Sequence, residues 1–198
     1  MLDCRIERIE TVAAWGTRFM NLTWNDPNAI SGTNCRERDR GLSAHGKDFV
    51  RELEGNRIYA DVSHLSDAGF WDLMKMARRP VVASHSNARA LCDHSRNLTD
   101  DMFRAIRDSG GVVGLNFYRT FVGGSGDMDA LIAHIEHFLE LDGEKTVCFG
   151  SDMDGCNPLV AGIDGLQSVG NLYEQLRQRG YHESLLEDLF WNNLRRLF

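Results

Sequence analysis

Hydrophobic and polar positions alternate along the chain with two different periods. Runs that are apolar at almost every position are typical of strands buried on both faces, and they lie at residues 18–24, 57–63, 80–86, 111–117 and 146–152. The segments between them repeat their apolar residues every three or four positions, as amphipathic helices do; these are residues 2–15, 46–54, 67–78, 99–110, 128–141, 166–179 and 182–196. Buried strands separated by helices predict an α/β fold with a parallel sheet covered by helices.

No part of the sequence indicates a boundary between domains. The segment GGSG at 123–126 is short enough to be a loop, and no low-complexity region interrupts the chain. We therefore expect one domain over residues 1–198. The polar stretch 25–45 is long for a connection between a strand and a helix, and loops of that length are often functional.

Composition narrows the choice of partners and compartment. The 198 residues carry a formal net charge of −7, which argues against nucleic acid and acidic membrane surfaces as partners. No apolar run approaches the roughly 20 residues that span a bilayer, and the start MLDCRIERIE lacks the apolar core of a signal peptide. The five cysteines show no CxxC spacing, which favours a reducing compartment over a disulfide framework. We therefore expect a cytoplasmic protein.

Each predicted strand ends in side chains that can bind a metal, donate a hydrogen bond or move a proton. In chain order these are Trp24 with Asn25, His64, His85, Asn116 with Tyr118, and Asp152. Active sites of parallel α/β folds gather at the carboxyl ends of the strands, because the connecting loops converge there. Five chemically suitable strand ends in one chain therefore favour a functional site at that edge.

The two strand-ending histidines have two interpretations of about equal weight. His64 and His85 follow neighbouring predicted strands, and neutral imidazoles on adjacent strands fit a zinc-type metal. Alternatively, both are hydrogen-bonded residues that close their strands. A catalytic zinc usually has three protein ligands, so two histidines alone do not make a metal site.

Asp152 and Arg96 also have alternative roles. Asp152 is either a metal ligand, a general base or the N-cap of the next segment. Arg96 either grips a carboxylate with two hydrogen bonds or forms a surface salt bridge, and without further context the salt bridge is the more ordinary explanation. The other histidines, which we expect to be surface or structural residues, are His45, His94, His134, His137 and His182.

Several segments spread over nearly the whole chain carry a specific family resemblance. They are NLTWN (21–25), GLSAHG (41–46), DVSHLS (61–66), PVVASHSNARALCDHSRNLTDD (80–101), GGVVGLNFY (110–118), HIEHFLEL (134–141), FGSDMDG (149–155) and the closing FWNNLRRLF (190–198). In this order and spacing they resemble the membrane dipeptidase (renal dipeptidase) family of zinc peptidases.

The resemblance implies a fold and a chemistry. The family fold is a (β/α)8 TIM-type barrel with two zinc ions in a complete site. By resemblance, His64 and His85 are ligands of one zinc, Arg96 and Tyr118 contact the substrate, and Asp152 is the acid/base group. The implied reaction is hydrolysis of the peptide bond of dipeptides by a metal-bound hydroxide, often with tolerance of a D-residue at the C-terminal position.

Two departures from the family pattern change these expectations. Trp24 stands where animal members carry a histidine that helps to bind the substrate carbonyl, so the substrate preference stays open and Asn25 is the candidate to compensate. The HxD motif of the family's first strand and its bridging glutamate have no counterpart here. We therefore expect a partial (β/α)8 barrel of about five βα units with parallel strands, in which His64 and His85 hold zinc weakly.

This leaves three hypotheses. The first is a truncated metallo-dipeptidase, inactive alone, which a complementing N-terminal fragment or homo-oligomer formation would complete. The second is a non-catalytic barrel remnant that acts as a binding or subunit-pairing module through its open sheet edges. The third is another barrel metallohydrolase, such as an amidohydrolase, and the run SHSNARALCDHSRN argues against it.

Overall fold

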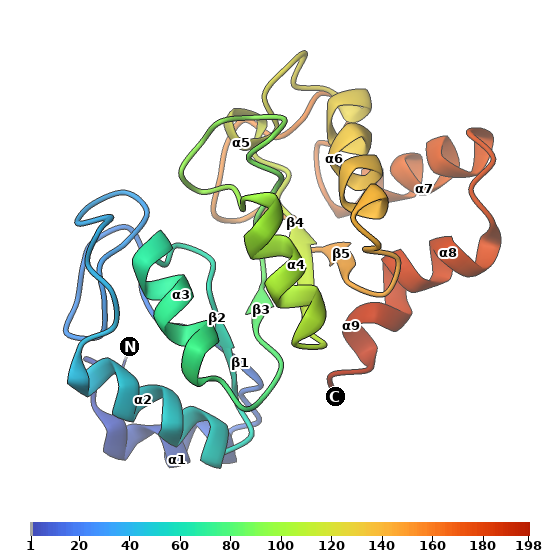
Figure 1. The fold of residues 1–198 in the computed structure, drawn as a ribbon. Helices are drawn as coiled ribbons and strands as arrows, with labels where there is room; N and C mark the ends of the chain where they lie inside the picture. Colours follow the sequence, from blue (N-terminus) through green and yellow to red (C-terminus); the bar gives the residue numbers. More distant parts are fainter. Residues whose placement is uncertain (1) are drawn as a thin grey trace. The chain divides into compact units, whose positions relative to one another are not determined.

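The computed structural model describes residues 2–198, which form two compact units. The first unit comprises the chain up to Ala83 together with Ser109–Gly111, and the second comprises Ser84–Asp108 together with Val112–Phe198 (Figure 1). The chain therefore passes from one unit to the other at the end of its third strand. Each unit is described by itself below.

The first unit consists of three short parallel strands and the helices that connect them. Its elements are the 3-10 helix η1 (Ile6–Arg8), α1 (Ile9–Ala14), β1 (Phe19–Asn21), α2 (Ala44–Gly55), β2 (Tyr59–Asp61), α3 (Asp67–Met76) and β3 (Val82–Ala83). In the sheet, Phe19 is in register with Tyr59, and Asp61 with Val82. Every residue of β2 is buried, as a strand covered on both faces requires.

Side-chain caps start both long helices of this unit. The Ser43 hydroxyl accepts a hydrogen bond from the Gly46 amide at the start of α2, and the Ser66 hydroxyl accepts one from the Gly69 amide at the start of α3. Helix α2 buries Phe49 and its apolar neighbours and packs on β2.

The second unit holds the remaining two strands and most of the helices. Its elements are α4 (Asp100–Asp108), β4 (Val112–Leu115), α5 (Arg119–Val122), α6 (Met128–Glu140), β5 (Val147–Phe149), the 3-10 helix η2 (Leu166–Ser168), α7 (Val169–Gln178), α8 (Glu183–Glu187), the π-helical turn η3 (Asp188–Asn192) and α9 (Asn193–Arg195). Strand β4 pairs in parallel with β5, with Val113 opposite Val147. The chain after β3 runs beside β4, where the Ser86 amide donates to the Gly114 carbonyl.

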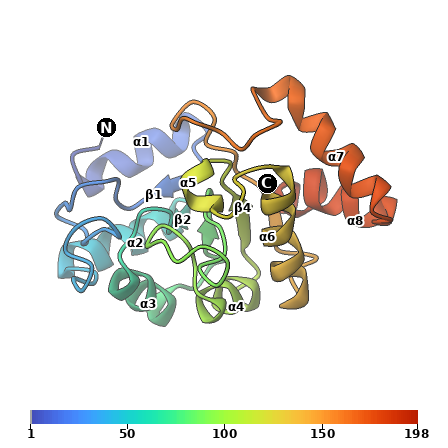
Figure 2. The same cartoon turned by 90° about the horizontal axis from the view of Figure 1, so that it is seen from above.

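The core of the second unit is built on aromatic and aliphatic side chains from its helices and strands. Phe103 on α4 stacks face to face on Phe138 on α6, with ring centroids 4.1 Å apart, and both rings are buried. Helices α4 and α6 are labelled in Figure 2. Strand β4 is buried at every position. The stacking of Phe103 on Phe138 ties the two helices together.

The predicted α/β fold with five parallel strands is confirmed. The strand order β1-β2-β3-β4-β5 follows the sequence, and each strand lies inside its predicted segment. One detail was wrong: the four-residue helix α5 was not predicted. The single-domain expectation for residues 1–198 stays a prediction.

Candidate active site

In the first unit, the loop after β1 and the loop after β2 bring together two of the predicted site residues. The Nδ1 atom of His64 lies 3.1 Å from Oδ1 of Asn25. With the amide oxygen as the acceptor, this contact corresponds to the tautomer that carries its proton on Nδ1. The neighbouring Trp24 side chain is 69% exposed.

His64 has an unusual backbone conformation. Its φ angle is 76°, in the left-handed region, and its side chain is buried with only 9% of the residue exposed. The carbonyl oxygen of His64 accepts a hydrogen bond from the Asn34 amide, and Thr33 forms a β-bridge with Leu65. The long polar loop 25–45 is therefore attached to the strand end that carries the histidine.

In the second unit, His85 and Arg96 are held near each other by the chain that follows β3. The Nδ1 atom of His85 lies 2.6 Å from the Ser84 hydroxyl, and the Arg96 guanidinium donates to the carbonyl oxygen of His85 over 3.5 Å. Arg96 is only 3% exposed, so the surface salt bridge considered for it is wrong. A buried guanidinium in a strand-end loop is suited to pair with an anion.

Asn116 connects the other two predicted residues of the second unit. Its Nδ2 donates to Oδ2 of Asp152 over 3.0 Å, and its Oδ1 accepts the Tyr118 amide over 2.7 Å. Asn116 is itself held by Asn87, whose side chain hydrogen-bonds both the backbone amide and the backbone carbonyl of Asn116. Both asparagines are fully buried, so Asp152 and Tyr118 rest on a rigid polar support.

Asp152 does not act as an N-cap. Its carboxylate accepts from Asn116, while the turn that follows is closed by a hydrogen bond from the Gly155 amide to the Asp152 carbonyl. Its φ angle of 61° lies in the left-handed region. The carboxylate therefore points back to the end of β4 and remains available for the metal or acid/base roles.

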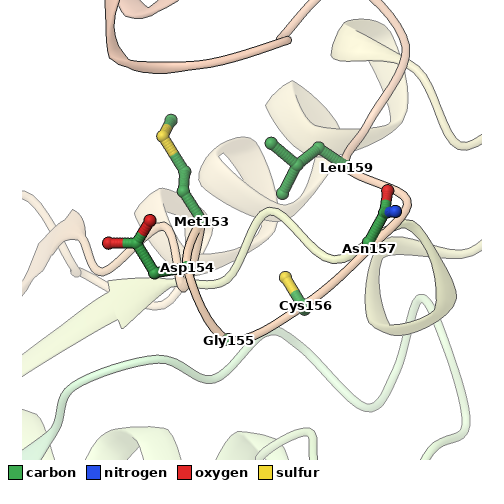
Figure 3. A pocket seen from close by; sticks show the side chains of 6 residues that line it. All are labelled: Met153, Asp154, Gly155, Cys156, Asn157 and Leu159. Carbon is green, nitrogen blue, oxygen red and sulfur yellow. The ribbon is translucent and has the colours of Figure 1, made fainter.

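The loop after Asp152 borders an open hollow of about 550 Å³. Figure 3 shows the residues that line it, which are Met153, Asp154, Gly155, Cys156, Asn157 and Leu159. The Cys156 thiol donates to the Asp152 carbonyl, and burial, with a smaller effect of the Asp152 charge, raises the pKa of Cys156 to about 11. Burial raises the pKa of Cys148 to about 12. Neither thiol is a thiolate nucleophile at neutral pH.

The predicted site residues thus fall into two sets, one in each unit. Asn25 and His64 belong to the first unit, and His85, Arg96, Tyr118 and Asp152 belong to the second. Among residues 2–198, no three histidine, cysteine, aspartate or glutamate side chains lie close enough together to hold a metal ion. None of the helices formed by these residues is long and apolar enough to cross a membrane.

Parallel strands followed by histidine, asparagine and aspartate give an α/β fold with polar side chains at the carboxyl ends of its strands, where active sites of such folds lie. The family is given by comparison with known proteins. The chain belongs to the membrane dipeptidase family, Peptidase family M19, whose model matches residues 1–198. This is a family of metallopeptidases that act on dipeptides, as the resemblance implied.

The chain is also similar to individual proteins. An uncharacterised Klebsiella pneumoniae protein encoded in the pqqA 5′ region is 37% identical over 197 residues, covering 93% of this chain and 72% of that protein. An uncharacterised dipeptidase of Schizosaccharomyces pombe is 35% identical over 176 residues, covering 85% of this chain and 42% of the relative.

A solved structure shares both fold and sequence. It is a metallopeptidase from Rhodobacter sphaeroides liganded with a phosphinate mimic of the dipeptide L-Ala-D-Ala, with 31% identity and a TM-score of 0.90. The match covers 96% of this chain, and this chain spans 57% of the solved one. The common part is therefore this α/β segment of a larger fold, which agrees with the partial barrel expected from the sequence.

Proposed function

We propose that this chain takes part in the hydrolysis of dipeptides as a metal-dependent dipeptidase. The observation that carries the proposal is the match of the membrane dipeptidase family over residues 1–198. The arrangement of Asp152 and Tyr118 on the buried Asn116 supports it, because a reaction site needs groups held in fixed positions.

The two candidate metal ligands, His64 and His85, suit zinc but do not make a complete site. His64 in the first unit and His85 in the second would each bind a metal ion through Nε2, since the Nδ1 atom of each ring is engaged by Asn25 or Ser84. Two imidazoles are fewer than the three protein ligands of an ordinary catalytic zinc. When bound, zinc supplies a Lewis acid that polarises the scissile carbonyl and lowers the pKa of water.

The other predicted residues have roles that follow from their surroundings. Asp152, oriented by the Asn116 amide, would accept and return the proton during hydrolysis. The buried Arg96 guanidinium and the Tyr118 hydroxyl would bind the substrate, whose free carboxylate matches the charge of Arg96. Asn25, next to the exposed Trp24 in the first unit, would also contribute to substrate binding.

We further propose that the missing metal ligands come from a complementing N-terminal fragment or from a second copy of the chain. The alternative function is a non-catalytic binding or subunit-pairing module. It is favoured by the absence of a three-residue metal cluster among residues 2–198. Calorimetric titration with zinc separates the two, because tight binding of two zinc ions by the chain alone contradicts the non-catalytic module.

The proposed activity is tested by hydrolysis of L-Ala-D-Ala with added zinc, by the chain alone and mixed with the N-terminal region of a relative. Asp152→Asn should lower kcat by about 10²- to 10⁴-fold, the usual range for loss of an acid/base group. Asp108→Asn is the matched control, because Asp108 is an exposed carboxylate at the end of α4. His85→Gln should weaken zinc binding, whereas His182→Gln, at an exposed position before α8, should not.

Absence of hydrolysis from both preparations with zinc present would refute the dipeptidase proposal. Equal activity of Asp152→Asn and wild type would refute the role of Asp152 while leaving the activity itself in place.

A further inference from the structure

Helix α5 and the loop that carries Arg96 are joined by a buried asparagine. Asn97 donates through Nδ2 to the Cys92 carbonyl over 2.9 Å and to the Phe121 carbonyl over 2.8 Å, and it is fully buried. The Cys92 thiol also donates to the Thr120 carbonyl over 3.5 Å. The loop before α4 is therefore fixed directly against α5, although more than twenty residues separate the two in sequence.

The Phe121 ring on α5 contacts two side chains of the candidate site, Arg96 and Tyr118, and also packs against His94. The Arg96 guanidinium carbon lies 5.3 Å from the ring centroid, within the range of a cation–π interaction. The Tyr118 ring meets Phe121 edge to face, with centroids 4.8 Å apart and planes at 86°. The His94 ring packs against it with centroids 4.6 Å apart.

His94 links this cluster back to the Arg96 main chain. Its Nδ1 accepts a hydrogen bond from the Arg96 backbone amide over 3.1 Å. His94 therefore contacts both the Arg96 backbone and the Phe121 ring, on which the Arg96 guanidinium lies. Arg96 is almost fully buried and cannot be held in place by solvent. The aromatic ring is thus a surface shared by the two residues that we assign to substrate binding, Arg96 and Tyr118.

We propose that Phe121 is a positioning residue, which sets Arg96 and Tyr118 relative to each other so that together they bind the carboxylate of a dipeptide. This inference rests on the proposed function. A guanidinium held over a ring face keeps its hydrogen-bonding edge in one plane, which is the requirement for bidentate pairing with a carboxylate. An edge-to-face contact likewise restricts the orientation of the Tyr118 ring.

The test compares a dipeptide that has a free carboxylate with its C-terminal amide. Binding of L-Ala-D-Ala and of L-Ala-D-Ala amide is measured by calorimetry with zinc present, and KM and kcat are measured with both. Phe121→Leu should weaken binding of the free dipeptide about tenfold, equivalent to about 1.4 kcal/mol, and raise KM with little change in kcat. Binding of the amide should change much less. Phe121→Tyr keeps the ring face and should retain the wild-type preference.

The matched control is Phe190→Leu. Phe190 is another half-buried phenylalanine of the same unit, whose ring packs on Phe149 and Tyr173. Phe190→Leu should reduce stability and leave the ratio of carboxylate to amide binding unchanged. Phe121→Met, which keeps a long apolar side chain without a ring, serves as a second variant if Phe121→Leu does not fold.

The outcomes separate this inference from the function on which it rests. If Arg96→Met abolishes the preference for the carboxylate and folded Phe121→Leu and Phe121→Met keep it, the positioning role is overturned and the proposed function stands. If the wild-type chain binds neither dipeptide, or Arg96→Met has no effect on the preference, the proposed substrate-binding role falls and the inference falls with it.

Discussion

Asn116 is the residue whose removal should affect stability and chemistry together. Its side chain accepts the Tyr118 amide and donates to the Asp152 carboxylate, and it is fully buried at the end of β4. The substitution Asn116→Ala deletes both hydrogen bonds and leaves the backbone contacts from Asn87 in place, because those use main-chain atoms of Asn116.

The expected loss of stability follows from the two hydrogen bonds that the substitution removes. An amide left without a partner inside a protein costs about 1–3 kcal/mol, and the Tyr118 amide is only partly buried, so about 1–2 kcal/mol is expected. The bond to Asp152 adds about 1 kcal/mol, since water can replace part of it at this half-buried carboxylate. The free energy of unfolding should therefore fall by about 2–3 kcal/mol. Because the Asp152 carboxylate is then no longer held in one orientation, kcat should fall about ten- to a hundredfold.

The control for this substitution is Asn193→Ala. Asn193 is as deeply buried, and its Nδ2 donates to the Glu144 and Val147 carbonyls over 2.8 Å each. It does not bond Asp152. Urea denaturation followed by circular dichroism should show a comparable loss of stability for both variants, whereas the decrease in kcat for dipeptide hydrolysis should occur only with Asn116→Ala.

A further variant separates orientation of Asp152 from general disruption. Asn116→Asp places a carboxyl oxygen where an amide donor lay 3.0 Å from the Asp152 carboxylate, and two carboxylates this close cannot both be ionised. The acid limb of the pH–rate profile should move to higher pH. An unchanged profile for Asn116→Asp, together with unchanged kcat for Asn116→Ala, would refute the reasoning.

Three other predictions concern stability. Burial lowers the pKa of His134, so the folded state binds a proton at this residue less readily than the unfolded state does. The free energy of unfolding should therefore fall as the pH drops below about 6.5. Denaturation between about pH 5 and 8 should show a smaller fall for His134→Gln. Ser66→Ala removes the hydroxyl that accepts from the Gly69 amide at the start of α3 and donates to the Arg40 carbonyl over 2.7 Å, and should cost at least about 1 kcal/mol in urea denaturation, with no loss contradicting the cap. Phe103→Ala removes the ring that stacks on Phe138 and should cost about 3–5 kcal/mol by the same measurement, with a value below 1 kcal/mol contradicting the packing.

The fold could be predicted because its determinants are local in the sequence. A run such as 111–117, apolar at successive positions, can only be buried on both faces, and β4 lies within it. A serine directly before a periodic apolar segment identifies the start of α3. The helix α5 was missed because a four-residue helix between Tyr118 and the glycines at 123–124 has no hydrophobic period to detect.

The site was predictable only in part, because its side chains are organised by contacts between distant segments. His64, His85 and Asp152 are found from their position after strands. For Arg96 the sequence favours a surface salt bridge, because its burial depends on contacts that only the folded chain makes. The contact of Arg96 with Phe121 joins a loop to a helix that the sequence does not indicate, so no periodicity could have pointed to that ring.

The backbone gives a last reason to regard the strand ends as functional. His64 and Asp152 both adopt left-handed φ angles, 76° and 61°, in a region that glycine occupies without cost. For residues with a β-carbon the conformation costs roughly 1–2 kcal/mol each. Strain of this kind persists where the surrounding contacts hold it, here Asn25 on His64 and Asn116 on Asp152. Among residues 2–198, five other residues with a β-carbon also have positive φ angles, namely Asp3, Cys4, Glu37, Arg57 and Asp142. The conformation therefore points to function at His64 and Asp152 only together with the side-chain contacts that hold it there.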